Sequence, residues 1–541
     1  MKINKHYLEA LAFIAVYLFT LYLWTLPFQD NNTPYGEFDA ISHWELADFI
    51  AQRDKTFVSL PPFLDYSYSL NNRFKPHTLW YHPPFHTDMA ISSAFAGDRM
   101  IPIYLTNAIF ATAVFVSVYF VMRKLFGFLP AILSFFLLSA SMRDILPYLW
   151  GQWPERFGYA FVPLIMYCFY KYWTTYSKES SKPIYLYIMS ILLAVNLFIH
   201  PLVMFHSIVG VAFLGIGLFI KDRKLSLNFR HILISLLIFA LLASIFPYQT
   251  GNVIVSFLKD SGSNSVKPSL SRLFEWTPEN ASPDKFAGSV PAAYFSFKQM
   301  HGSWTLPFLI LGIIVLLIRR EKRDIFLLMW LFSLYLILHR DLIGKPTFIH
   351  RSLSASAHIF VPLIVIGALS ISSLLPLPKL YKNLLKYGAA ALVVILTFNY
   401  NIPPAYSTLS QAYDSPFLRP NQAQVEVSEW LQQKLNETEN VSIIGPFPDI
   451  MKKVWWMASY SHRTSAYFEG FLDWPQYEQN RNETIKYHLL NDYIVFDYTD
   501  IGLLQDRSFV DRWIKFEQEN MKNHALIYNK NNIRVYKYGA S

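Results

Sequence analysis

The sequence predicts a polytopic α-helical membrane protein with about eleven transmembrane helices and a small extracytoplasmic α/β domain at the C-terminal end. Three observations predict this class. Only 16% of the residues are charged, whereas a soluble domain carries about 25%. Long apolar runs recur between residues 8 and 400, and several of them are long enough to cross a bilayer. From residue 401 onward the composition is that of an ordinary soluble protein.

The apolar runs define the expected spans, although several are shorter than the usual ~20 residues. The first run follows Lys2 and Lys5 and lacks a small-residue cleavage site, so we expect a retained signal anchor. The predicted spans are roughly residues 8–26, 100–122, 126–142, 158–174, 183–199, 201–220, 231–247, 304–318, 325–339, 356–376 and 387–400.

The loops between the spans predict the orientation. Lysine and arginine cluster in alternate loops, for example at Arg123-Lys124, residues 221–224 and residues 319–323, which places the N-terminus in the cytoplasm. The opposite side then receives residues 27–99, 143–157, 248–303, 340–355 and everything after about 401. Asn-x-Ser/Thr sequons fall on that side at Asn31, Asn280, Asn436, Asn440 and Asn482. We therefore expect a multi-pass protein of the plasma membrane with an extracytoplasmic C-terminal domain.

Charge and cysteine content exclude other classes. The formal charge of +9 lies mainly in short loops between apolar runs, so membrane topology accounts for it and we expect no nucleic-acid partner. The single cysteine, Cys168, excludes an intrachain disulfide and a cysteine-based zinc site.

The first long outer loop carries the principal candidate residues. Glu37, Asp39 and His43 follow the first span, and a helix from Asp39 to Ile50 would place Asp39 and His43 on one face. Acid–base and phosphate chemistry use such groups, and a solvated interfacial helix is the alternative. The loop ends in His82-Pro83-Pro84-Phe85-His86, where the prolines favour an extended entry and then a helix. This element either lines a substrate site or is a rigid loop with interfacial aromatics.

Two further outer loops carry charges close to the hydrocarbon. Arg143, Asp144, Glu155 and Arg156 lie between the third and fourth spans. They either mark a site, pair with one another or snorkel at the interface. Between the ninth and tenth spans, the cations suit phosphate oxygens or, alternatively, anionic lipids. These cations are Arg340, Lys345 and Arg351. We expect the two histidines inside spans, His206 and His358, to form interhelical hydrogen bonds.

The C-terminal part predicts a small α/β domain of roughly 140 residues. Its pattern favours helices near residues 424–435, 449–460 and 508–520, and strands near residues 441–444, 493–496 and 533–536. It has no phosphate-binding glycine loop, metal-spaced histidines or nucleophile elbow, so no chemistry is assigned to it. We expect domain boundaries at residues 1–400 and 401–541.

This arrangement resembles the C-type (GT-C) membrane glycosyltransferases, which include protein O-mannosyltransferases, oligosaccharyltransferase catalytic subunits and aminoarabinose transferases. The resemblance covers the whole chain as architecture. The matching features are an acidic motif after the first span, a His-Pro-Pro element before the second, a later acidic motif, an arginine before a late span and an external C-terminal domain. They correspond to Glu37-Phe38-Asp39 with His43, His82-Pro83-Pro84, Asp144 with Glu155, and Arg351.

The resemblance implies transfer of a sugar from a polyprenyl or dolichyl phosphate to a glycan, lipid or protein acceptor, with inversion expected, and membrane lipids as further partners. It implies that Asp39 acts as the base and that Arg351 neutralises the leaving phosphate. The other implied catalytic residues are Glu37, His43, Asp144 and Glu155. The implied substrate-binding residues are Arg351, Arg340, Arg143, Arg156, Lys345, His82 and His86.

The metal requirement stays open, because neither acidic loop contains Asp-x-Asp and no metal ligand is assigned. A divalent cation such as Mg²⁺ or Mn²⁺ would need oxygen ligands, which Glu37, Asp39, Asp144 and Glu155 carry. Two alternative functions also stay open, namely a non-catalytic envelope scaffold and a transporter or flippase for lipid-linked saccharides. A transporter favours ionisable or helix-breaking sites near the bilayer midplane, whereas these charges lie at the outer ends of spans.

Overall fold

The computed structural model describes most of the chain, and its contacts divide the protein into two compact units. The helical unit comprises Met1–Leu26, Leu105–Tyr148 and Gln152–Ser410, and the α/β unit comprises Pro27–Tyr104, Leu149–Gly151 and Gln411–Ser541. The first long loop therefore belongs to the same unit as the C-terminal segment. The domain boundary expected at residue 400 was based on the change in composition, and it stays a prediction. The described residues are 5–30, 32–36, 38–53, 82–176, 182–259, 292–339, 349–412, 419–436, 439–444, 450–463, 465–466, 492–499 and 507–538.

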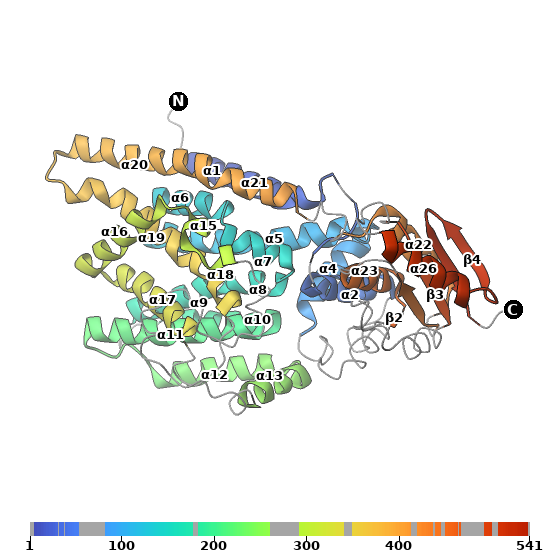
Figure 1. Cartoon of the computed structure of the whole chain (residues 1–541). Coiled ribbons are helices and arrows are strands. Elements are labelled where there is room, and N and C mark those ends of the chain that lie inside the picture. Colours follow the sequence, from blue (N-terminus) through green and yellow to red (C-terminus); the bar gives the residue numbers. More distant parts are fainter. Residues whose placement is uncertain are drawn as a thin grey trace. The chain divides into compact units, whose positions relative to one another are not determined.

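Helices make up the helical unit (Figure 1). Each of the eleven predicted spans overlaps one of them. They are α1 Lys5–Thr25, α5 Ile101–Leu125, α6 Phe128–Ser139, α7 Met142–Trp150, α8 Trp153–Tyr159, α9 Phe161–Thr175, α10 Ile184–Ile199, α11 Pro201–Asp222, α12 Phe229–Ala243, α13 Pro247–Lys259, α14 Ala292–Phe295, α15 Phe297–His301, α16 Thr305–Arg319, α17 Lys322–Leu338, α18 Ile349–Ser354, α19 Ser356–Leu374, α20 Lys379–Tyr400 and α21 Ile402–Ser410.

The chain is a multi-pass membrane protein, but the count of eleven spans is not confirmed. In the described part of the chain, five helical segments are long and apolar enough to cross a membrane, or seven if each of two bent pairs counts as one span. The bent pairs are α6–α7, at 45°, and α12–α13, at 108°. Helices α9, α10, α16 and α17 contain only 15 to 17 residues, which is short for a span of ~20 residues.

Helices α16 and α19 approach each other at backbone distance. A Cβ atom on Gly312 would lie 2.1 Å from the carbonyl oxygen of Leu363, and one on Gly367 would lie 1.9 Å from that of Phe308. Such contact requires glycine, and small residues at membrane helix interfaces commonly permit it. In the span that contains α19, 78% of the apolar window is buried, whereas the value is 22% for the span that contains α20. Helix α19 is therefore a central helix of its unit.

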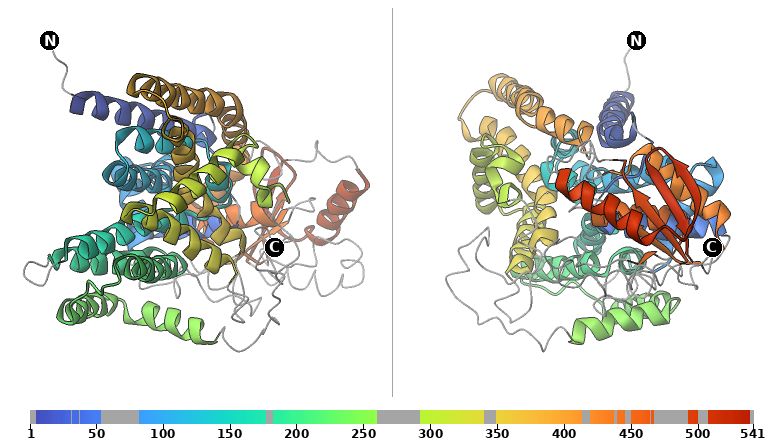
Figure 2. Two further views of the ribbon diagram at one scale, coloured as in Figure 1. Left: turned by 90° about the vertical axis from the view of Figure 1, so that its left-hand side faces the viewer. Right: turned by 45° about the vertical axis from the view of Figure 1, so that its right-hand side comes forward.

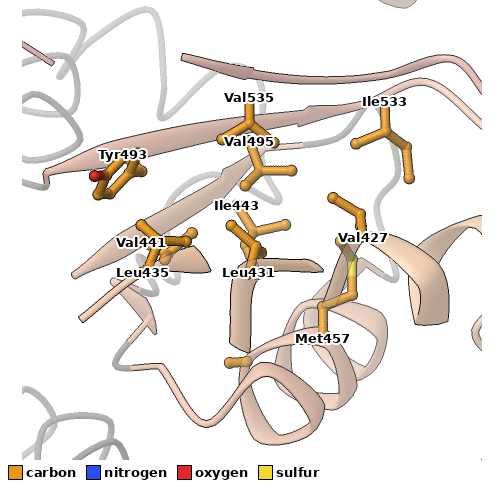
Figure 3. Close-up of a cluster of buried hydrophobic side chains, with 11 residues drawn as sticks. Val427, Leu431, Leu435, Val441, Ile443, Met457, Tyr493, Val495, Ile533 and Val535 are labelled. Atoms are coloured by element: carbon orange, nitrogen blue, oxygen red, sulfur yellow. The ribbon is translucent and has the colours of Figure 1, made fainter. Parts of the chain in front are cut away.

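The α/β unit contains a five-stranded mixed sheet between two layers of helix. Its strands lie in the order β2-β1-β3-β5-β4, with β2, β1 and β3 parallel and β5 antiparallel to β3 and β4. Side chains of α22 and α23 pack on one face (Figure 3), and α26 packs on the other (Figure 2). The bounds are β1 Val441–Ile444, β2 Ser465–Ala466, β3 Tyr493–Asp497, β4 Ala525–Lys530, β5 Ile533–Lys537, α22 Gln422–Lys434, α23 Ile450–Ser461 and α26 Arg507–Asn520.

Two helices of the first long loop belong to the same unit as this sheet. Helix α2, Phe38–Arg53, confirms the helix expected from Asp39 to Ile50, and α4, Pro84–Ala96, begins at the second proline of the His-Pro-Pro element. Helix α2 packs on α4 and α23. Its Trp44 ring stacks on Tyr460 of α23, with centroids 5.1 Å apart. A short 3-10 helix, Leu26–Phe28, precedes α2.

Candidate functional site

A buried charged cluster joins α7, α8 and α19 in the helical unit. Asp144 and Arg156 are fully buried and form an ion pair between Oδ1 and Nη2. His358 Nε2 lies 2.8 Å from Asp144 Oδ1 and 3.0 Å from Arg156 Nη2. The interhelical hydrogen bond expected of His358 is thereby confirmed. Buried charges are retained only where they are paired in this way, because removing one partner leaves an uncompensated charge.

Glu155 lies in the same helix as Arg156 and is linked to α18 through a tyrosine. The buried Glu155 carboxylate accepts a hydrogen bond of 3.0 Å from the Tyr159 hydroxyl. That hydroxyl lies 3.5 Å from the carbonyl oxygen of Arg351, and the Ser354 hydroxyl donates to the same oxygen at 2.7 Å. The structure therefore brings Glu155 and the backbone of Arg351 to one place.

His206 of α11 lies beside this region. Its Nε2 atom is 3.2 Å from the Ser352 hydroxyl in α18, so the interhelical hydrogen bond expected of His206 is confirmed as well.

Two buried arginines of the helical unit keep unsatisfied donors. Arg143 Nη2 donates to the carbonyl oxygen of Phe295 at 3.4 Å, and its guanidinium lies 4.9 Å from the centre of the Tyr294 ring. The Nε and Nη1 atoms of Arg143 and Arg156 have no hydrogen-bond acceptor among the described residues. A buried unsatisfied donor costs about 1–3 kcal/mol, and guanidinium donors match oxyanions such as phosphate. The chemistry of this cluster suits an anionic ligand.

The α/β unit holds the other candidate residues. Asp39 lies in the first turn of α2 and is half-buried, whereas His43 is buried with its Nδ1 3.0 Å from His86 Nε2 of α4. Burial lowers the pKa of His82 to about 4, so that imidazole is neutral at physiological pH. The structure thus brings His43 and His86 together, between the two helices of the loop.

Glycine at position 151 shapes the start of α2. Gly151 has a φ of 93°, and a Cβ on it would lie 2.0 Å from the backbone nitrogen of Ala40. Gly151, which belongs to the α/β unit, therefore packs directly on the first turn of α2, at the residue after Asp39. Only glycine permits both this φ and this approach.

Three of the sequence-predicted site residues, Glu37, Arg340 and Lys345, lie outside the described residues. Because the outer loops lie on one membrane face, we expect Asp39, Asp144 or Glu155, and Arg351 to converge on one outer cavity. These residues belong to different units, so the convergence stays a prediction.

One oxygen of Asp144 does not suit a metal cation. Its Oδ1 atom already contacts a guanidinium and an imidazole, and a metal cation there would meet the positive charge of Arg156. Over the described ranges, no group of three His, Cys, Asp or Glu side chains is arranged to hold a metal ion.

Several polar residues of these clusters were not found from the sequence. Tyr159 and Tyr294 sit in aromatic-rich stretches that are typical of any membrane protein, so nothing distinguished them. Asp48, Arg99 and His462 form a buried cluster in the α/β unit. Arg99 carries the one weak signal of these three, a cation directly before an apolar run.

Comparisons with known proteins identify the fold. The model of a family of unknown function, DUF6541, matches residues 5–347. No curated protein matches the chain in sequence. The oligosaccharyltransferase of Archaeoglobus fulgidus, in a complex with Zn and sulfate, is similar in structure, with a TM-score of 0.57 and 13% identity over 97% of this chain and 73% of that chain.

Two lipid-bound structures are also similar. The oligosaccharyltransferase AglB from Archaeoglobus fulgidus, bound to an inhibitory peptide and a dolichol-phosphate, matches with a TM-score of 0.52 and 12% identity over 99% of this chain and 74% of that chain. ArnT from Cupriavidus metallidurans, bound to undecaprenyl phosphate, matches with a TM-score of 0.57 and 8% identity over 99% of each chain. At these identities the likeness concerns the fold, and the resemblance to C-type glycosyltransferases is confirmed at that level.

Proposed function

The chain belongs to DUF6541, a family of unknown function, and we propose that it is a membrane glycosyltransferase that uses a polyprenyl or dolichyl phosphate sugar. One observation carries the proposal: the fold shared with ArnT extends over 99% of both chains, and that ArnT structure contains undecaprenyl phosphate. The acceptor would be a glycan, a lipid or a protein on the extracytoplasmic face. The placement of sequons and of cationic loops supports that face.

In the proposed reaction Asp39 removes the proton from an acceptor hydroxyl. The acceptor oxygen attacks the anomeric carbon, the bond from that carbon to the phosphate oxygen breaks, and the lipid phosphate leaves with the electron pair. Attack opposite the leaving group would invert the anomeric centre. A carboxylate is a weak base, so it serves as one only when it is held against the hydroxyl while the bond to the leaving group breaks.

Arginines are proposed to stabilise the charge that develops on the leaving phosphate. The unsatisfied donors of Arg143 and Arg156, together with the position of Arg351 beside Glu155, support this assignment. Arg156 is already neutralised by Asp144, so Arg143 and Arg351 are the better candidates for direct contact with the phosphate. Since these residues supply positive charge, we assign Asp39 the role of base rather than that of metal ligand.

The test is sugar transfer by the purified full-length chain in lipid nanodiscs, from a panel of short-chain polyprenyl phosphate sugars. Asp39→Asn keeps the shape of the side chain but removes proton acceptance, so transfer should fall by about 10²–10⁴ while donor binding changes little. The matched control is Asp88→Asn, at an exposed position on α4 of the same unit, which should transfer normally.

Three outcomes would count against parts of the proposal. Failure of the unmodified chain to transfer sugar from any lipid-linked donor would argue against the enzyme assignment. Full activity of Asp39→Asn would favour the non-catalytic scaffold. Complete loss of activity with a chelator, accompanied by weaker donor binding in Asp39→Asn, would replace the base role with a metal-holding role.

A further inference from the structure

A second carboxylate of α2, Asp48, is fully buried and has no part in the proposed chemistry. Arg99, which lies between α4 and α5, binds it with two hydrogen bonds. Nε donates to Oδ1 at 3.0 Å and Nη2 donates to Oδ2 at 2.6 Å. His462, directly after α23, places its Nε2 2.7 Å from Oδ2. Three segments that are distant in the sequence therefore meet at one carboxylate.

The Arg99 guanidinium also contacts the C-terminal segment. Nη1 donates to the side-chain oxygen of Gln432 at 3.0 Å, and Nη2 donates to the carbonyl oxygen of Tyr460 at 2.8 Å. The guanidinium also lies 4.0 Å from the centre of the Tyr460 ring, the ring that stacks on Trp44 of α2. Through Arg99 and the Trp44 ring, these contacts link α2 to α22 and α23.

The hydrogen bonds assign the protonation state of His462. Arg99 can only donate, so the amide oxygen of Gln432 faces it and the amide nitrogen of Gln432 donates to His462 Nδ1 at 3.3 Å. His462 Nδ1 therefore carries no proton, and Nε2 donates to Asp48. Burial raises the pKa of Asp48, but the charge of Arg99, the hydrogen bonds from His462 and Arg99 and the electrostatic attraction of His462 together outweigh burial and hold that pKa below its usual value. The cluster thus holds an ionised Asp48 between Arg99 and His462.

The unusual backbone conformation of His462 indicates that the histidine side chain is needed at this position. Its φ of 52° lies in the left-handed region, which is uncommon for any residue other than glycine and costs free energy. The next residue, Arg463, is buried and donates to the carbonyl oxygens of His462 and Gln432, at 2.9 Å each. One turn before Asp48, the Glu45 carboxylate accepts a hydrogen bond of 2.6 Å from Ser459 of α23.

We infer that Asp48, Arg99 and His462 are positioning residues, through which the C-terminal segment fixes the direction of α2 and therefore the position of Asp39. The inference rests on the proposed function of Asp39. Asp39 precedes Asp48 by nine residues, which is roughly 13 Å along a helix axis. A tilt of about 10° at Asp48 would move Asp39 by roughly 2 Å, and a misplacement of ~1 Å can cost ~10²-fold in rate. The C-terminal domain is thereby part of the catalytic apparatus, although it carries no catalytic residue.

The first experiment measures amide hydrogen exchange of α2 in the full-length protein in nanodiscs. His462→Ala removes the hydrogen bonds that link this loop to Asp48 and Gln432, so exchange in α2 should rise by about tenfold or more. Glu517→Ala is the matched control, because Glu517 is equally buried in the α/β unit but its partners, Tyr498, Tyr536 and Arg534, lie on the sheet. It should leave exchange in α2 unchanged.

The second experiment measures transfer kinetics of the same variants. His462→Ala should lower kcat by ~10-fold or more with an unchanged KM for the lipid donor, because α2 is misdirected while donor contacts remain. His462→Gln restores an N–H donor toward Asp48 and should recover most of the rate. Arg99→Lys keeps the positive charge but loses the paired hydrogen bonds to Asp48, so it should lower kcat as well. This variant tests the inference even if the His462→Ala protein does not fold.

The outcomes separate this inference from the proposed function. Unchanged α2 exchange in folded His462→Ala and Arg99→Lys overturns the inference, as does raised exchange with a normal kcat. A parallel loss of kcat in Glu517→Ala would overturn it too, because the effect would then be general destabilisation. If the unmodified chain transfers no sugar, the proposed function fails, and with it the catalytic part of the inference. The exchange data then still decide whether the C-terminal segment holds α2.

Discussion

Asp144 and Arg156 lie twelve residues apart in the sequence and form one buried ion pair in the structure. The sequence allowed these charges to form a ligand site, to pair with one another or to snorkel at the interface, and the structure pairs Asp144 with Arg156. Arg143, from the same stretch, lacks such a carboxylate contact and lies against the Tyr294 ring instead. The sequence could not distinguish the two arginines, because their partners come from other helices and only folding selects them. Of these two arginines, Arg143 is therefore the one whose positive charge is available to bind an anionic ligand.

His82 makes the stability of the α/β unit depend on pH. Its pKa is lowered by burial from 6.5 to about 4, so the unfolded chain binds a proton at a pH where the folded protein does not. The stability contributed by the neutral imidazole is therefore fully present above the unfolded value of 6.5 and is lost as the pH falls toward about 4. A shift of this size corresponds to a few kcal/mol, of order ~3, at most.

Thermal unfolding of the full-length protein in detergent, followed between about pH 7 and pH 4, checks this expectation. The unmodified protein should lose stability across that range more steeply than His82→Gln, which has no group that titrates there. Equal slopes for the two proteins would contradict the assignment of a depressed pKa to His82.

Helix α19 depends on glycine where it crosses α16. Gly312→Ala would place a methyl group against the carbonyl oxygen of Leu363, which is backbone and cannot rotate away, so the helices must separate. We expect a loss of about 1–3 kcal/mol or more, the usual range for overpacking, measured as a lower Tm in detergent. Gly388→Ala in α20 is the control, because no atom lies within 4 Å of its new Cβ and alanine favours a helix. A drop in Tm for the control as large as for Gly312→Ala would refute the packing argument.

Secondary structure was predictable where one residue pattern dominated. The apolar runs predicted the helices, and the pattern Val-Ser-Ile-Ile predicted β1 with its observed bounds. Strand β4 was missed because Ala525–Lys530 is largely exposed and has no clear alternation, as expected of an edge strand. The packing of α2 on α23 was not predictable from composition, because the residues that join them, Trp44 and Tyr460, look like ordinary interfacial aromatics.

For the whole molecule, the orientation in the membrane is the prediction that most needs a direct test. After Cys168→Ala, single cysteines at Gln299 and Lys224, both exposed, would report opposite sides. A membrane-impermeant thiol reagent added to intact cells should modify Gln299→Cys and should not modify Lys224→Cys, because Lys224 lies in a cationic loop expected inside. Modification of Lys224→Cys alone would reverse the proposed topology.

The contact between Arg99 and Tyr460 joins residues 361 positions apart. During biosynthesis this contact cannot form until the ribosome has made Tyr460. A ribosome adds about 5–20 residues per second, so Tyr460 is made roughly 20–70 s after Arg99. Throughout that interval Trp44 and Arg99 have been synthesised, but Tyr460, which stacks on the one and accepts a hydrogen bond from the other, has not. A nascent chain that stalls in the membrane helices would therefore expose the aromatic and charged surface of α2, and cellular quality control could recognise that surface as unfinished.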